Sequence, residues 1–180
     1  MGNHMDLGTL LGLQLRAHKN AVYGSLLLWA TLSAMGLAFL QLSVSNAIFA
    51  GLIATLLHWD SELWHQLGHA WAAKRTGYPM QGITFVGLLA ASRYPSDEPD
   101  LPAEIHIRRA LGGPIASLVV SLLSGLAALA LQPVGGALLM VTMFWFLDNV
   151  FVFFLGSLLP LGFTDGSTLL YWWPRRGEKS

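Results

Sequence analysis

Four long apolar runs restrict this chain to folds that can be buried in lipid. The first run, residues 21–42, carries no charged residue and is about as long as a helix must be to cross a bilayer. Three more follow at residues 47–75, 108–131 and 137–159. Charged residues make up only 11% of the 180 residues, whereas soluble domains carry about 25%. We therefore predict an all-α membrane protein with about four transmembrane helices.

The basic residues predict how these helices are oriented. With four spans, all ten Lys and Arg residues fall on one side, and the two turns on the other side, near Ser43 and Gln132, have none. The positive-inside rule then places both termini and residues 74–109 in the cytoplasm of a multi-pass cell-membrane protein. The formal net charge is zero, so the lipid bilayer is an expected partner and nucleic acid is not.

The segments outside the apolar runs are short. The first five residues, MGNHM, resemble an expression tag, which leaves residues 6–180 as one domain. Residues 6–20 are expected to form an amphipathic lead-in at the membrane interface. Residues 78–93 are rich in β-branched and aromatic residues and predict one or two strands, or a hairpin, beside the membrane. Pro160 and Gly162 should break the fourth helix and leave a broken-helix loop over residues 160–173.

The second apolar run carries a polar stripe. His58, Glu62, His65 and His69 fall within an arc of roughly 60° on a helix. Ionisable groups are costly in lipid, so the stripe should face the bundle interior or a wet cavity. His65 and His69 are four residues apart, and both imidazoles can therefore reach one metal ion. The alternative is a buried polar ladder that only fixes helix packing.

Two histidines do not complete a catalytic zinc site, which usually has three protein ligands. The chain has no cysteine, so the third ligand must be Asp, Glu or another His. Asp165 is favoured because it follows the helix break and precedes Gly166, where a tight backbone can turn the carboxylate into the bundle. The other candidates at a suitable depth are Glu62, His58 and Asp148.

Three segments resemble the zinc intramembrane proteases of the site-2 protease family. They are HQLGHAWAAKRTGYP at residues 65–79, LGGPIASL at 111–118 and SLLPLGFTDG at 157–166, and their order and approximate spacing agree with the family. The resemblance implies a minimal protease core with one catalytic Zn²⁺ held by His65, His69 and Asp165. It also implies metal-activated hydrolysis of transmembrane segments near the cytoplasmic side, as in regulated intramembrane proteolysis. Ser117 and Ser157 stand where the family has Asn.

Gln66 stands where the family has the catalytic Glu of its HExxH motif. Gln is nearly isosteric with Glu but cannot act as a base at neutral pH, so metal binding should survive while turnover is lost. An engineered Glu→Gln substitution fits the tag-like N-terminus. A natural pseudoprotease that binds membrane helices, and Glu62 serving as the base, remain open. A metal or proton transporter that uses the His/Asp cluster is a further alternative.

The segment after the second helix is the candidate substrate strand. A transmembrane helix hides its peptide bonds in its own hydrogen bonds and must unwind before it can be cut. The segment 80–92 could hold the unwound substrate by edge addition. Its candidate residues are Met80, Gly82, Ile83, Thr84, Phe85, Val86 and Gly87. Asn149 is a second candidate, in place of the family's Asn residues. Alternatively, the strand only plugs the site.

Overall fold

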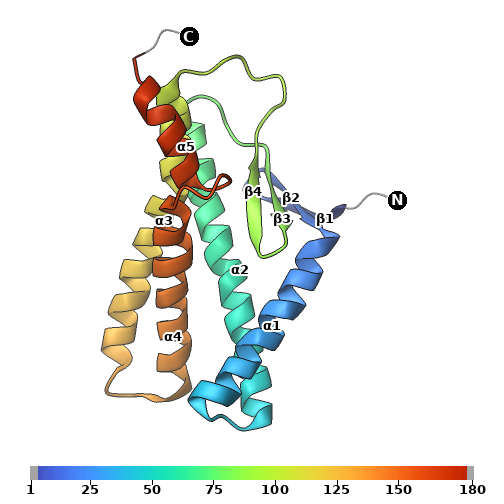
Figure 1. Ribbon diagram of the computed structural model, residues 1–180, viewed down its shortest axis with the longest axis vertical. Coiled ribbons are helices and arrows are strands. Elements are labelled where there is room, and N and C mark those ends of the chain that lie inside the picture. Colours follow the sequence, from blue (N-terminus) through green and yellow to red (C-terminus); the bar gives the residue numbers. More distant parts are fainter. Residues whose placement is uncertain (1–3, 178–180) are drawn as a thin grey trace.

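The computed structural model describes residues 4–177, and four long helices form its bundle (Figure 1). They are α1 (Lys19–Leu40), α2 (Val44–Arg75), α3 (Ala103–Leu131) and α4 (Gly136–Asp148), close to the four predicted spans. Helix α2 packs against both α1 and α3, and α3 also packs against α4. Residues 1–3 of the predicted tag and Lys179 of the predicted cytoplasmic tail lie outside the described residues.

Three helical segments within residues 4–177 are long and apolar enough to cross a membrane. They are Lys19–Leu40, Ala103–Leu131 and Gly136–Gly156, the last of which joins α4 to the turns that follow it. Helix α2 has 32 residues, but its polar stripe and the cations at its end keep it out of this group. The chain is therefore a membrane protein in which α2 is more polar than the other three long helices.

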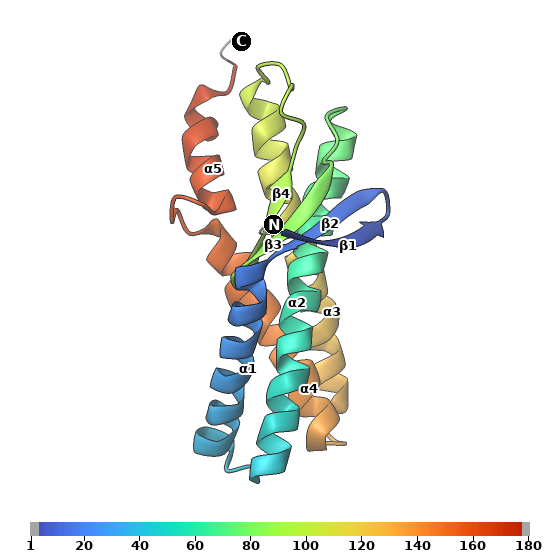
Figure 2. The ribbon, with the colours of Figure 1, turned by 90° about the vertical axis from the view of Figure 1, so that its right-hand side faces the viewer.

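A four-stranded sheet lies beside helix α2, next to the N-terminal end of α1 (Figures 1 and 2). The predicted hairpin near residues 78–93 is present as β3 (Gly82–Val86) and β4 (Leu89–Arg93). The prediction for residues 6–20 missed a second hairpin, β1 (His4–Leu10) and β2 (Leu13–His18), whose strand β2 pairs in parallel with β3. Two features of the sequence could have indicated this hairpin. Gly12 suits the turn, where Leu11 and Gly12 both have positive φ angles, and residues 13–17 alternate so that Leu13 and Ala17 are buried.

The fourth helix ends differently from the prediction. After Asp148 the chain continues as a π-helix, η1 (Asn149–Leu155), and a 3-10 turn, η2 (Gly156–Leu158). The break follows at Pro160 and Gly162, whose φ is +91°. The predicted loop over residues 160–173 is too long, because helix α5 (Asp165–Trp172) and the 3-10 turn η3 (Trp173–Arg175) occupy its second half. Asp165 is thus the first residue of a helix, where a carboxylate is favoured.

Helices α2 and α3 cross in direct backbone contact at Gly68 and Gly112. A Cβ atom added at either glycine would overlap the carbonyl oxygen of the other. Such close contact between small residues is typical of helix pairs in membranes. The crossing fixes the level of the next residues along each helix, His69 and Gly113, and so helps to position the candidate site.

Candidate metal centre and cavity

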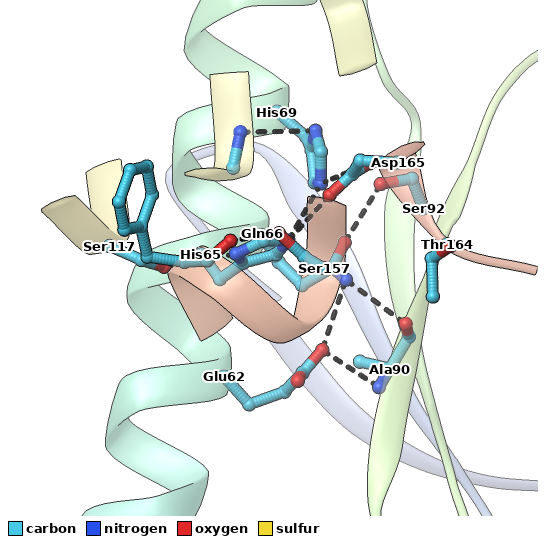
Figure 3. A network of polar contacts seen from close by, with 12 residues as sticks. Glu62, His65, Gln66, His69, Ala90, Ser92, Ser117, Ser157, Thr164 and Asp165 are labelled. Atoms are coloured by element: carbon cyan, nitrogen blue, oxygen red, sulfur yellow. Dashed lines mark hydrogen bonds and ion pairs between the residues drawn. The ribbon is translucent and has the colours of Figure 1, made fainter. Parts of the chain in front are cut away.

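Helix α2 and the start of α5 bring three ligand-type side chains together (Figure 3). The Nε2 atoms of His65 and His69 are 3.0 Å apart. The Asp165 carboxylate places Oδ2 at 3.1 Å from Nε2 of His65 and Oδ1 at 3.3 Å from Nε2 of His69. These are the three residues that the sequence predicted as ligands.

The three ligand atoms have the spacing of a zinc site. Tetrahedral zinc with bonds of about 2.0 Å keeps neighbouring ligand atoms about 3.3 Å apart. Nδ1 of His69 lies 2.8 Å from the carbonyl oxygen of Arg109, and Nδ1 of His65 lies 2.9 Å from the Ser117 hydroxyl. A carbonyl only accepts hydrogen bonds, which favours a proton on Nδ1 of His69, whereas the backbone N–H of Gly113, 3.2 Å from the same atom, favours a lone pair there. Such outer hydrogen bonds are typical of metal-binding histidines.

Gly113 keeps the space beside the cluster open. A Cβ atom at this position would fall far inside van der Waals contact with Nε2 of both His65 and His69. Gly166 has a matching role on the other side, because a Cβ there would overlap the Leu158 carbonyl and push α5 away. The residues present therefore fit a single zinc ion held by two imidazoles and one carboxylate.

The Asp165 carboxyl is ionised at neutral pH. Burial raises its pKa, but hydrogen bonds from His65 and His69 outweigh burial and hold the pKa at about 2. The cluster thus presents an anionic oxygen next to two imidazole nitrogens. Either a shared proton or a metal cation must lie among these three groups.

Gln66 and Glu62 are bound to strand β4 (Figure 3). The Gln66 amide donates to Oε1 of Glu62 and to the carbonyl of Ala90, both at 3.0 Å. Its carbonyl accepts from the Ser92 hydroxyl at 2.8 Å. The backbone N–H of Ala90 donates to the same Glu62 oxygen, also at 2.8 Å. Both N–H groups of the Gln66 amide and its carbonyl oxygen are therefore engaged in hydrogen bonds.

The predicted substrate strand has no free edge. Strand β3 pairs with β2 on one side and with β4 on the other, and the edge toward Gln66 belongs to β4. Met80 and Ile83 are buried in a small core with Leu13 and Ala73. Among the seven predicted residues only Val86 lines the cavity at the cluster. Edge addition, predicted for the segment 80–92, is thus possible at β4, which lies in that segment, but not within β3.

His58 of the stripe and the substrate candidate Asn149 both have partners away from the cluster. His58 contacts Asp148 at 3.3 Å through Nδ1 and the carbonyl of Leu88 at 2.9 Å through Nε2. The buried Asn149 amide donates to the Ser61 hydroxyl at 2.8 Å and does not line the cavity. His58 and Asp148, which the sequence left open as third ligands, thus form a separate pair deeper in the bundle.

A cavity of about 920 Å³ opens at the cluster between α2, α3, β4, η1 and α5. Its polar end carries His65, His69 and Asp165, and its other walls include Phe153, Phe163 and Trp172. Ser157, which takes the place of a family Asn, also lines it. The cavity therefore places apolar walls beside a potential metal site.

Arg109 joins three segments at the rim of this cavity. Its guanidinium donates to Glu98 and to the carbonyl of Tyr78 at 2.7 Å, and it lies 4.1 Å from the centre of the Tyr94 ring. Burial raises the pKa of Tyr94, against the opposing effect of Arg109, so the phenol stays protonated. The carbonyl of Arg109 also contacts Nδ1 of His69, so Arg109 connects these three segments to the metal cluster. Its residues are far apart in the sequence, which gave no sign of it.

Comparison with solved structures identifies the fold as that of a site-2 intramembrane protease. The chain is similar to the site-2 protease from Methanocaldococcus jannaschii, with a TM-score of 0.63 over 93% of this chain and 69% of that chain. The sequence identity is 17%, so the likeness concerns the fold. Models of protein families give no match to the chain, and curated protein sequences give none either.

Proposed function

We propose that the chain is the core of an intramembrane zinc endopeptidase that is silenced at residue 66. The observation that carries the proposal is the convergence of His65, His69 and Asp165 at the end of an apolar cavity, with Gln66 one residue from a ligand. The site-2 protease fold supports the same reading. Zinc bound there would polarise a scissile carbonyl and lower the pKa of a water molecule.

Gln66 cannot take a proton from water, and its environment suits an amide. The amide N–H₂ group satisfies two acceptors, Glu62 and the Ala90 carbonyl. A Glu at this position would face both with lone pairs and would repel the Glu62 carboxylate. We infer that Gln66→Glu releases the side chain from β4 and makes it available to the cavity. Glu62 is less accessible to a water molecule than such a Glu, because its Oε1 already accepts hydrogen bonds from Gln66 and Ala90.

The substrate in this proposal is a transmembrane segment that unwinds beside β4. The outer N–H and C=O groups of Ala90 are now bound by Glu62 and Gln66, in place of a strand. An extended substrate would exchange these side-chain hydrogen bonds for backbone ones. With the charge distribution of the chain, we place the site near the cytoplasmic face of the cell membrane, with both termini in the cytoplasm.

Restoring the base tests the proposal. Gln66→Glu in liposomes should cleave a peptide that spans the bilayer, and the double variant Gln66→Glu/Asp165→Ala should not. Cleavage by neither variant, with zinc bound and a membrane peptide retained, would instead support a pseudoprotease that holds membrane helices. Zinc flux into sealed vesicles that does not depend on residue 66 would contradict the protease and support a transporter.

A further inference from the structure

A second cavity, of about 1260 Å³, lies on the other side of the α2–α3 pair. It is bounded by α2, α3 and the tip of the β1–β2 hairpin, which runs across α2 in Figure 2. The two cavities share no lining residue. The proposed hydrolysis at the metal cluster does not involve this groove.

The groove is positively charged at one end. Lys74, Arg75 and Arg108 line it, and none of its lining residues within the described chain is acidic. The Arg75 guanidinium lies 4.0 Å from the centre of the Trp71 ring. Because no carboxylate of the groove neutralises these cations, the groove suits an anion.

The remainder of the groove is apolar and open. Trp64, Leu67 and Trp71 share one face of α2, and the two tryptophans are 47% and 57% exposed. Ile115 of α3 faces the same space and is 53% exposed. A soluble protein would seldom leave so much aromatic surface open, but tryptophan is favoured where a membrane helix meets the headgroups.

The charged and apolar parts are separated along the helix axes. The Gly68–Gly112 contact forms the floor of the groove. At 1.5 Å per residue, Lys74 and Arg75 lie about 9–10.5 Å from this contact toward the C-terminal end of α2, and Trp64 lies about 6 Å from it in the opposite direction. Arg108 lies about 6 Å from the contact on the charged side. The groove thus has a cationic head region and an apolar tail region.

We propose that this groove binds an anionic phospholipid. Its phosphate would lie among Lys74, Arg75 and Arg108, and an acyl chain would run over Trp71, Leu67 and Trp64. Basic pockets between membrane helices at the headgroup level are suited to such lipids. Leu11, at the hairpin tip beside the groove, is 83% exposed and would reach the same lipid layer. A soluble phosphate compound fits the charge but leaves the apolar half of the groove without a partner.

Native mass spectrometry of the full chain in detergent, titrated with phosphatidylglycerol or phosphatidylcholine, measures this binding. Phosphatidylglycerol should bind more tightly, and the variant Lys74→Ala/Arg75→Ala/Arg108→Ala should lose roughly a hundredfold in affinity. The matched variant Lys19→Ala/Arg175→Ala/Arg176→Ala, which also removes three cations, should change the affinity less than twofold. Equal affinity for the two lipids, or equal losses in the two variants, would overturn the proposal, as would displacement of the lipid by inorganic phosphate.

A second measurement does not need the cations to be removed. In vesicles that contain both lipids, brominated phosphatidylglycerol should quench the tryptophan fluorescence more than brominated phosphatidylcholine does. Trp64→Phe/Trp71→Phe should remove this preference, whereas Trp29→Phe/Trp173→Phe should keep it. A preference that survives the loss of Trp64 and Trp71 would place the lipid elsewhere and contradict the groove.

Discussion

The two sides of the α2–α3 pair differ in the burial and hydrogen bonding of their polar side chains. On one side, His65, His69 and Glu62 are buried, and each is held by specific hydrogen bonds. On the other side, Arg75 is exposed and stacks on an exposed tryptophan. The same two helices therefore present a hydrogen-bonded polar cluster on one side and an exposed basic and aromatic surface on the other. Neighbouring residues of α2 line different cavities: Gly68 lines the groove, and His69 lines the cavity at the cluster.

Removing a ligand histidine should have the largest effect on the buried side. His69→Ala takes away one of three ligand atoms, and zinc should fall from about one equivalent to a trace, measured by metal analysis of the purified chain. His58→Ala is the matched control on the same stripe. It leaves Asp148 unpaired and lowers stability, but zinc should stay stoichiometric. Equal zinc loss in both variants would show that the stripe acts as one polar ladder.

Gly113→Ala should empty the site without removing any ligand. Its Cβ would overlap Nε2 of both histidines, so either the imidazoles or α3 must move. We expect zinc affinity to fall by more than about a hundredfold, measured by competition with a chelator. Gly125→Ala is the control further along α3, where a Cβ meets only the Phe146 side chain at 3.0 Å and zinc binding should be unchanged. Normal zinc affinity in Gly113→Ala would contradict the described approach of α3 to the cluster.

Ser117→Ala should have a smaller effect on the same cluster. It removes the hydroxyl beside Nδ1 of His65, and loss of such an outer partner weakens metal binding by about 10–100-fold. Ser124→Ala also removes a buried hydroxyl of α3, but this one donates to the Val120 carbonyl, so zinc affinity should hold. The same chelator competition compares the two. If neither serine substitution changes the zinc affinity, the ring of His65 is oriented by packing alone.

The sequence predicted the parts of this molecule that depend on local pattern. The lengths of the apolar runs predicted the four helices. The spacing of His65 and His69, together with the helix break before Asp165, predicted the cluster. It could not predict pairings between distant segments. Nothing local shows that Ala90 binds Glu62, or that Arg109 binds Glu98 and Tyr78. The parallel pairing of β2 with β3 is equally non-local. Because of it, β3 has no free edge at which a substrate could bind.

The smallest expected effect concerns the contact between α2 and β4. Ser92→Ala removes one hydrogen bond to Gln66 and should lower the free energy of unfolding by about 1 kcal/mol, measured in detergent with a denaturant series. In the Gln66→Glu background we expect the same substitution to cost less, because the released Glu no longer keeps this partner. Identical costs in both backgrounds would mean that residue 66 stays bound to β4 whichever side chain it carries.

The central claim is that His65, His69 and Asp165 hold one zinc ion on the buried side. X-ray absorption at the zinc edge of the purified full chain tests it most directly. The account predicts one zinc per chain with two imidazole nitrogens and one carboxylate oxygen from the protein, and loss of the oxygen ligand with most of the metal in Asp165→Ala. Zinc retained undiminished by Asp165→Ala, with an unchanged ligand shell, would contradict it.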